Sequence, residues 1–226
     1  GEGNVLISCD YSQQELRILA HFSQDPALIA MFDSDEDPFV YIGSMLYPDD
    51  PLTGKNDPRR DSIKTLVYGL IYGMGLKKYA AQTGLPIEEA KAIRENFFTV
   101  FPGVQEYMRT TTREAERMDS PHAFTVFGRK VACDKGYEYK LSNYRIQGTA
   151  ADQMKLAVSA LYDAGLHHYL RIVIHDEMVL EVPEELAPII AKQVEEIMQE
   201  AGAYAFDLTF EAEANIAYDF GAFKDK

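Results

Sequence analysis

The sequence RIVIHDEMVLEV, residues 171–182, contains two short apolar runs separated by a polar turn that includes Asp176 and Glu177. Apolar runs of this length, rich in β-branched residues, predict two antiparallel strands with the carboxylates at their tip. Another apolar run, Val5–Cys9, predicts a buried strand that leads into Asp10. If these strands are neighbours, Asp10 and Asp176 meet at one end of a sheet.

Two carboxylates that meet in this way would suit divalent cations. Mg²⁺ takes oxygen ligands, and two such ions ~3.5–4 Å apart can clamp the attacking and leaving oxygens of a phosphoryl displacement. The alternative is structural, because an aspartate in a loop and an Asp-Glu hairpin turn are both common. Asp10 and Asp176 alone do not decide between the two readings.

A predicted helix over residues 59–72, ended by the glycines of Gly73-Met74-Gly75, carries a second chemical pattern. Positions four apart share one helix face, and here they are Arg60, Lys64, Tyr68 and Tyr72. The opposite side is apolar and suited to packing: Ile63, Leu66 and Leu70. A triphosphate held by the two cations and a base stacked on the rings would use all four stripe residues. The alternative is an ordinary amphipathic helix with two half-buried tyrosines.

The order of predicted elements indicates an α+β fold in which a mostly helical segment interrupts a sheet. The chain of 226 residues is 46% hydrophobic, enough for one domain or two interleaved ones. Ser12 and Glu15 have the spacing of a capping box before a helix. Further helices are predicted over residues 26–32, 38–46, 77–83, 86–100, 102–118, 143–164 (with a mild interruption at Gly148) and 183–201. A hairpin is predicted over 123–131 and a last strand over 205–212.

The formal net charge of −14 taken alone argues against nucleic-acid binding, because phosphate contacts come from Lys and Arg. The acidic residues concentrate in 184–213, however, and local charge decides where a polyanion can bind. Cations cluster elsewhere: Arg59, Arg60 and Lys64; Lys77 and Lys78; Arg129 and Lys130; Lys140 and Arg145. No apolar stretch approaches the ~18 residues of a membrane helix and no signal peptide opens the chain. Cys9 and Cys133 form neither a disulfide framework nor a zinc motif, which favours a reducing compartment.

Four segments together resemble family A, polymerase I-like DNA polymerases, in the family's order. They are motif A, Asp10-Tyr11-Ser12-Gln13-Gln14-Glu15-Leu16-Arg17; motif B, Arg60-x3-Lys64-x3-Tyr68-Gly69-x2-Tyr72-Gly73; the palm helix, Asn143-x3-Gln147-Gly148-Thr149-Ala150-Ala151-Asp152; and motif C, His175-Asp176-Glu177. The resemblance implies a right-hand palm over residues 1–24 and 141–226, interrupted by fingers over 25–140, with the thumb absent. It also implies a DNA-directed DNA polymerase that adds dNTPs to a primer 3′ end, with primer-template DNA as partner.

The resemblance assigns roles to individual residues. Asp10 and Asp176 would bind two Mg²⁺ ions, with Mn²⁺ as a substitute, and the backbone carbonyl of Tyr11 and accessory Glu177 would assist. The dNTP would be bound by Arg60, Lys64, Tyr68, Tyr72, Glu15, Tyr11, Ser12 and Gln13. Lys64 is in addition a candidate acid for the departing pyrophosphate. Primer and template would be contacted by Asn143, Arg145, Gln147 and His175.

Some of these residues have structural alternatives. Glu15 would form a steric gate against a ribose 2′-hydroxyl with Tyr72 as its partner, but it also completes the capping box. His175 would contact the primer end or pack in the hairpin, and the alternative for Glu177 is a plain turn carboxylate. Tyr68 replaces the Phe of many relatives, and in the family Tyr there is linked to acceptance of dideoxynucleotides.

Three departures from the family pattern limit the reading. Tyr139 stands where relatives often have Arg, so Lys140 or Arg145 would have to replace one primer contact. Residues 219–223 match the family's terminal strand only loosely. The sequence also opens almost on motif A, so we expect a piece of a longer or split polymerase whose N-terminal thumb and palm segment, or a partner chain, completes it.

Three alternatives remain open. A single-subunit RNA polymerase shares the layout of motif B and a His-Asp in motif C, but Glu15 argues against it. An RNase H-like two-metal nuclease gives no reason for the stripe on residues 59–72. A non-catalytic fragment would need a partner chain for any activity. With no secretion signal, a cytoplasm (bacterial or of a phage-infected host) or an organelle matrix is the expected location.

Overall fold

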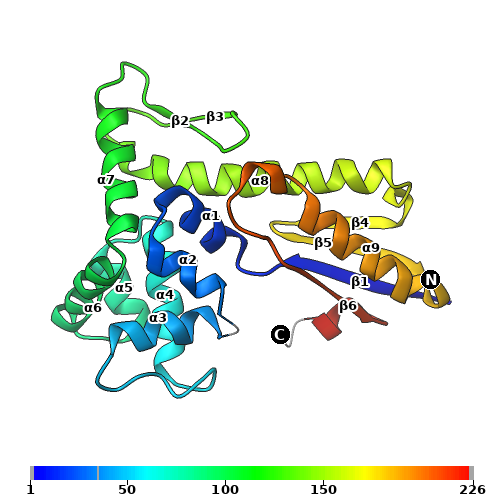
Figure 1. The fold of residues 1–226 in the computed structure, drawn as a ribbon, viewed down its shortest axis with the longest axis horizontal. Helices are drawn as coiled ribbons and strands as arrows, with labels where there is room; N and C mark the ends of the chain where they lie inside the picture. Colours follow the sequence, from blue (N-terminus) through cyan, green and yellow to red (C-terminus); the bar gives the residue numbers. More distant parts are fainter. Residues whose placement is uncertain (1–2, 35, 224–226) are drawn as a thin grey trace. The chain divides into compact units, whose positions relative to one another are not determined.

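The computed structural model describes residues 3–34 and 36–223, and the chain divides into two compact units (Figure 1). Unit 1 falls within Gly1–Ile18, Thr125–Arg129 and Gln147–Lys226, and unit 2 comprises Leu19–Phe124 and Lys130–Ile146. The chain therefore passes between the units after residues 18 and 146, where the sequence had suggested 24 and 140. Residues 125–129, the tip of a hairpin, group with unit 1.

Unit 1 is a four-stranded antiparallel sheet with helices, as the predicted α+β class requires. Its strands follow the order β4-β5-β1-β6. The elements are β1 Asn4–Tyr11, β4 Leu170–Ile174, β5 Glu177–Pro183, α9 Ala187–Glu200 and β6 Ala212–Ala217. Helices α1 Gln14–Ser23 and α8 Leu141–Asp163 each contain a boundary between the units. Short 3₁₀ turns lie at His167–Tyr169, Glu184–Leu186, Ala203–Ala205 and Phe220–Phe223.

The two faces of β1 have different environments, because successive side chains of a strand point to opposite sides. Val5, Ile7, Cys9 and Tyr11 are buried on one face, which packs toward α9. There the Tyr11 hydroxyl donates to the carbonyl of Met198 at 2.6 Å. Asp10 therefore lies on the opposite face, and α9 does not cover it.

Unit 2 is mostly helical. Its elements are α2 Pro26–Phe32, α3 Pro38–Leu46, α4 Arg59–Ile71, α5 Leu76–Thr83, α6 Ile87–Val100, α7 Pro102–Glu116, the strands β2 His122–Phe124 and β3 Lys130–Ala132, and a 3₁₀ turn at Glu138–Lys140. Asp25 and Asp37 cap α2 and α3 by accepting from two backbone N–H groups each, and a proline follows each cap. This Asp-Pro pattern explains why both helices begin at the residue predicted.

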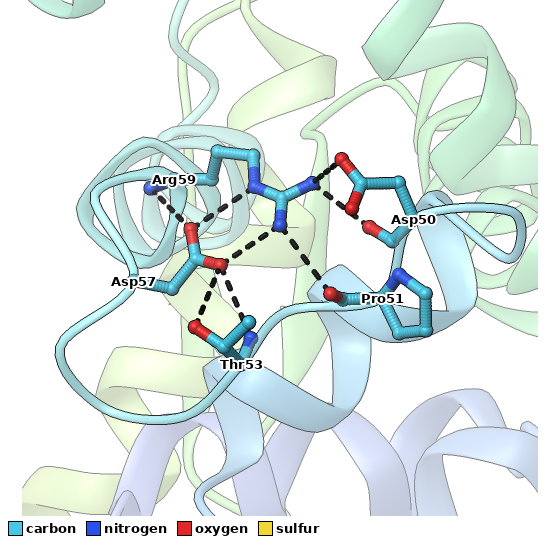
Figure 2. A network of polar contacts seen from close by, with 5 residues as sticks. All are labelled: Asp50, Pro51, Thr53, Asp57 and Arg59. Carbon is cyan, nitrogen blue, oxygen red and sulfur yellow. Dashed lines mark hydrogen bonds and ion pairs between the residues drawn. The ribbon is translucent and has the colours of Figure 1, made fainter.

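Figure 2 shows how the loop before α4 is tied to that helix. Arg59 donates from Nε and Nη2 to the two carboxylate oxygens of Asp57, at 3.0 and 2.8 Å. Its Nη1 donates to the carbonyl and the carboxylate of Asp50, at 2.8 and 2.9 Å. Asp57 also accepts from the backbone N–H groups of Arg59 and Thr53. The Asp57 side chain thus closes the loop through Thr53 and accepts the backbone N–H of Arg59 in the first turn of α4.

Three of the predicted elements differ from the structure. The last strand is β6 at 212–217, so the prediction of 205–212 was wrong, because pairing with β1 defines β6 and residues 203–205 form a 3₁₀ turn. Helix α9 begins at Ala187 because Pro183 still belongs to β5 and a 3₁₀ turn follows it. Helix α8 continues through Gly148 without interruption. Among the described helices, none combines the length and apolar character needed to cross a lipid bilayer.

Candidate catalytic centre

Unit 1 brings Asp10, Asp176 and Glu177 to one end of its sheet. In the β1–β5 ladder Asp10 lies opposite Glu177, and the backbone N–H of Tyr11 donates to the carbonyl of Asp176 at 3.1 Å. Paired residues of an antiparallel ladder project from the same face, so Asp10 and Glu177 share a side of the sheet. The two strand ends that the sequence predicted to meet are hydrogen-bonded neighbours.

Asp176 lies in a tight and partly buried turn. His175 and Asp176 are the two residues between β4 and β5, and His175 has a φ of 49°. A residue with positive φ at this position is typical of two-residue hairpin loops. Burial raises the pKa of the Asp176 carboxyl, and the charge of Glu177 adds to the effect, against lowering by a backbone hydrogen bond and His175. A cation bound here would compensate a carboxylate that has lost part of its hydration.

Further polar groups surround Asp10 on the same face. The Ser8 hydroxyl donates to Glu177 at 2.5 Å, which holds that carboxylate against β1. On the other side of Asp10, the β1–β6 ladder pairs it with Glu213. Glu177, Asp10 and Glu213 therefore form one row across the sheet. Glu213 was not anticipated; the alternation of polar Glu211, Glu213 and Asn215 with apolar neighbours is the signal that could have revealed it.

The donor set suits Mg²⁺ better than a metal enclosed by protein ligands alone. Within residues 3–34 and 36–223, no group of three or more His, Cys, Asp or Glu side chains is arranged to hold a metal ion by itself. Mg²⁺ usually keeps several waters and is bound by one or two carboxylates together with substrate phosphates. Asp10 and the desolvated Asp176 fit that pattern.

The residues that follow Asp10 differ in how far they are buried. Tyr11 is buried, so its side chain faces α9, and Gln14 donates to Gln153 at 3.0 Å inside unit 1. Arg17 donates to the carbonyls of Ser12 and Thr209 and to Glu211. Ser12, Gln13 and Glu15 are each partly exposed.

The predicted capping box of Ser12 and Glu15 is not formed. Gln13 has a φ of 54°, which is not helical, and α1 begins only at Gln14. The backbone N–H of Ser12, which Glu15 would accept in a capping box, donates instead to the carbonyl of Glu211 at 2.8 Å. Glu15 is therefore not committed to that structural role.

The Gly-Thr-Ala-Ala-Asp sequence of α8 docks a loop. Arg129 donates to the Asp152 carboxylate at 2.6 Å and to the carbonyl of Gly148 at 2.9 Å. The Thr149 hydroxyl accepts from the backbone N–H of Val126 at 3.2 Å. Residues 125–129 are thus fastened to α8 within unit 1. Gln147, just before this sequence, is exposed.

In unit 2, α4 presents the predicted stripe. Ile63, Leu66 and Leu70 are buried, as expected of the packing side. Lys64 is exposed and the Tyr72 side chain, at the C-terminal end of the helix, is 46% exposed. The rings of Tyr68 and Tyr72 are stacked, with centroids 6.0 Å apart and an interplanar angle of 16°.

Two residues of α3 support this stripe, and the sequence did not reveal them. Asp37 accepts from Arg60 Nε at 3.0 Å and from Nη2 at 2.7 Å, a bidentate ion pair. The fully buried ring of Phe39 lies 5.3 Å from the Arg60 guanidinium carbon and 5.7 Å from Lys64 Nζ. Its centroid is 5.9 Å from that of Tyr68. The sequence predicted the helix start at Asp37-Pro38, but not that Asp37 pairs with Arg60, 23 residues further on.

The other predicted nucleic-acid residues of unit 2 have mixed environments. The Oδ1 atom of Asn143 is buried without a hydrogen-bond partner among the described residues. Arg145 lies 4.1 Å over the ring of Phe22 and donates to the carbonyl of Phe124 at 2.8 Å, so part of this cation is used within the unit. Lys140 lies 4.3 Å over the ring of Tyr137, and Tyr139 is about half exposed.

Comparisons with known proteins agree with one another. The family model described as DNA polymerase family A matches residues 1–222. The chain is 36% identical over 198 residues to a DNA polymerase of Mycobacterium phage D29, and 33% identical over 238 residues to the thermostable DNA polymerase I of Thermus aquaticus. These alignments cover 88% and 99% of this chain but only 32% and 28% of the relatives. The chain thus spans less than a third of their length.

A solved structure is similar over nearly the whole chain. It is the POL domain of Pol1 from M. smegmatis in complex with DNA primer-template and dNTP, with a TM-score of 0.84 and 32% sequence identity. The similarity covers 98% of this chain and 41% of that one.

Proposed function

Because the chain belongs to DNA polymerase family A, we propose that it carries the catalytic centre of a DNA-directed DNA polymerase. The reaction would be template-directed addition of a dNTP to a primer 3′ end, with release of pyrophosphate. The observation that carries the proposal is the pairing of β1 with β5, which joins Asp10 to the Asp176-Glu177 turn. Unit 1 would be the palm and unit 2 the fingers.

Family A polymerases generally use divalent metal ions, and the carboxylates of unit 1 fit them. Asp10 and Asp176 would hold two Mg²⁺ ions, with Mn²⁺ able to replace Mg²⁺, and the Tyr11 carbonyl and Glu177 would assist. When bound, such ions activate the primer hydroxyl and neutralise charge on the departing pyrophosphate. The protein's own contribution is to hold the two aspartates on neighbouring strand ends at one end of the sheet. Ser8 keeps Glu177 beside them.

Helix α4 would bind the nucleotide. Arg60 and Lys64 supply cationic donors for the triphosphate, and Lys64 would return a proton to pyrophosphate. The stacked rings of Tyr68 and Tyr72 offer a surface for the sugar and base. Closure of this helix on a matched nucleotide would select the substrate.

The remaining predicted residues complete the nucleotide and DNA contacts. The sugar of the nucleotide would be lined by Ser12, Gln13 and Glu15, which lie two to five residues after Asp10. Glu15 would be the gate against ribonucleotides. The exposed Gln147 and the turn residue His175 are candidates for the primer-template, together with Asn143 and Arg145. The arginine would contact DNA while its guanidinium also lies over Phe22 and donates to the carbonyl of Phe124.

The rest of a polymerase would come from elsewhere, since the chain spans less than a third of its relatives. We propose that a thumb and palm segment, in the same polypeptide or in a partner chain, grips the duplex. Primer-template DNA and dNTPs are then the other partners, and a cytoplasm or an organelle matrix is the expected compartment.

The proposal is tested by primer extension. For this test the chain is joined to the part of the M. smegmatis POL domain that it does not match. We expect extension with dNTPs in Mg²⁺, and a loss of at least about 10³-fold in Asp176→Asn while duplex binding stays largely intact. Residual extension with lost binding would contradict the metal role.

Glu15→Ala should admit ribonucleotides. Extension by the unaltered chain with ribonucleotides alone would favour an RNA polymerase, and degradation of DNA without synthesis would favour a nuclease.

A further inference from the structure

The Arg60–Asp37 ion pair leaves part of the guanidinium available. Its Nε and one N–H of Nη2 point to the two oxygens of Asp37. A guanidinium has five N–H donors in a fixed plane, so the Nη1 edge and one further N–H remain. The carboxylate nearest to Nη1 belongs to Asp61, 3.7 Å away on a side chain that is 91% exposed. Asp37 therefore fixes the direction in which the unused donors of Arg60 face.

Asp37 is itself held in place. Its Oδ1 accepts from the backbone N–H groups of Phe39 and Val40, both at 3.1 Å, and its side chain is only 9% exposed. Burial alone would raise the pKa of Asp37, but hydrogen bonds from Arg60 and from these N–H groups outweigh it and lower the pKa. The carboxylate stays ionised and cannot follow Arg60 without uncapping α3.

Phe39 extends the same support along α4. It is the second residue of α3, two residues after the cap Asp37, and its buried ring lies against Arg60, Lys64 and Tyr68. Cations over an aromatic face are attracted by its quadrupole. The beginning of α3 thus supports the first three residues of the stripe through one cap and one ring.

We propose that Asp37 is a positioning residue for nucleotide binding: it orients the Arg60 fork so that its free edge meets the triphosphate. The inference rests on the proposed role of Arg60 in binding the nucleotide. A guanidinium already held in one rotamer loses less conformational entropy when a phosphate binds. A carboxylate beside Arg60 also weakens the positive field of its guanidinium, and this effect acts in the opposite direction. The two effects predict opposite changes in affinity.

The test is triphosphate binding to the 226-residue chain, measured by calorimetry with inorganic tripolyphosphate and with dGTP. Asp37→Asn keeps a side chain that caps helices as well as Asp does, so α3 is retained. We expect this variant to bind both ligands about 3- to 10-fold more weakly. Unchanged or tighter binding would overturn the inference.

Two matched variants separate orientation from charge and from capping. Asp61→Asn removes the same charge near the same guanidinium but touches neither Nε nor Nη2. Asp25→Asn changes the equivalent cap of α2, which accepts from Ala27 and Leu28 in the same way and in addition from the backbone N–H of Gly103, so the melting temperature of this variant is measured alongside. Both should leave the affinity within about twofold of the original. Equal weakening by Asp61→Asn would mean that the contact with Nε and Nη2 is not what matters and would overturn the inference.

Two further measurements identify Arg60 as the intermediary. The Nε–H resonance of Arg60 in ¹H–¹⁵N spectra should move to a solvent-averaged position in Asp37→Asn. With Arg60→Lys present, Asp37→Asn should have no additional effect on affinity. If Arg60→Lys weakens binding and Asp37→Asn does not, only this inference fails. If the unaltered chain binds neither ligand, the proposed role of Arg60 fails and the inference fails with it.

Discussion

Asp176 lies in a turn where burial disfavours the charged form of its carboxyl. Burial in the turn raises the pKa of its carboxyl, so the folded chain binds that proton more tightly than the unfolded chain does. The contribution of Asp176 to the free energy of unfolding is therefore greatest below its unfolded pKa of about 3.9. It declines as the pH rises from there through the folded pKa. At neutral pH the ionised Asp176 is a net destabilising group that a bound cation would compensate.

Asp176→Asn should therefore melt at a higher temperature than the unaltered chain at pH 7, by roughly 2–4 °C. The reason is that asparagine carries no charge to desolvate. The difference should shrink as the pH falls and vanish below about pH 4, where Asp176 is protonated in both states. Thermal unfolding followed by circular dichroism between pH 3 and 8 measures this, with Asp163→Asn at the exposed end of α8 as the control. A lower melting temperature for Asp176→Asn at pH 7 would contradict the prediction.

Added Mg²⁺ or Mn²⁺ should raise the melting temperature of the unaltered chain at pH 7, because a ligand that binds the folded state stabilises it by mass action. The shift should grow with metal concentration and be largely lost in Asp176→Asn. The control is Asp163→Asn, which should respond like the unaltered chain. Equal shifts in all three proteins would indicate binding elsewhere and would remove the support for this carboxylate as a ligand.

Tyr68→Phe should increase discrimination against dideoxynucleotides by about 3- to 10-fold, the value of one hydrogen bond. The tyrosine hydroxyl would otherwise replace a bond that the missing 3′-hydroxyl makes. The variant keeps the aromatic ring and with it the ring contacts with Phe39 and Tyr72. The ratio of incorporation efficiencies for ddNTP and dNTP, in the chain joined to the mycobacterial region, gives the result. Tyr72→Phe removes a hydroxyl one turn further on and should leave the ratio unchanged.

At the residue scale, what could be predicted followed local pattern. Asp10, Asp176 and the four stripe residues stand at positions fixed by strand ends and helical periodicity. Asp37, Phe39 and Glu213 were missed because their partners are set by tertiary packing: α3 against α4 and β6 against β1.

Among the elements, α4 depends on the loop that precedes it. Hydrogen bonds from the Arg59 side chain and backbone, together with Thr53, lower the pKa of Asp57, so its carboxylate stays ionised to low pH. An acid with a lowered folded pKa stabilises the fold above its unfolded pKa, and this contribution is lost as the pH falls through the folded value. The loop and the first turn of α4 should therefore loosen together when Asp57 is altered.

Asp57→Asn should lower the melting temperature at pH 7, and the loss should diminish below about pH 4 because Asp57 then contributes less in the unaltered chain. Asp50→Asn removes the other acid partner of Arg59, but that side chain is 84% exposed, so it should have little effect. Hydrogen exchange should show faster opening of the first turn of α4 in Asp57→Asn only. Equal destabilisation by the two variants would mean that the exposed contact matters as much as the buried one.

The ends of elements could be predicted where the sequence carries local start and stop signals. The Asp-Pro pairs fixed the starts of α2 and α3, and Gly73-Met74-Gly75 marked the end of α4. The final strand was misplaced because residues 205–217 alternate polar and apolar over more than one possible window. Pairing of residues 212–217 with Leu6–Tyr11 selects the register, and that choice depends on a strand 200 residues earlier in the chain.

For the molecule as a whole, the sequence predicts which elements form and in what order. The class and order of elements, and the interruption of the sheet by a helical segment, could be predicted from the sequence, but the points at which the two units divide could not. The boundaries fall inside α1 and α8, and the tip of the 123–131 hairpin groups with the sheet through Arg129 and Thr149. Helical periodicity carries no information about such a division.

The isolated chain should bind duplex DNA weakly and extend primers little or not at all. Its net charge is −14, and duplex affinity depends on the number of phosphates that cations neutralise. Joined to the remaining region of the mycobacterial POL domain, it should gain both binding and extension, and the binding should fall steeply with salt. Fluorescence anisotropy with a labelled primer-template, at several salt concentrations, and a gel assay of extension measure the two properties. The joined chain carrying Asp176→Asn separates them, because it should bind without extending, whereas strong extension by the isolated chain would show that these two units suffice.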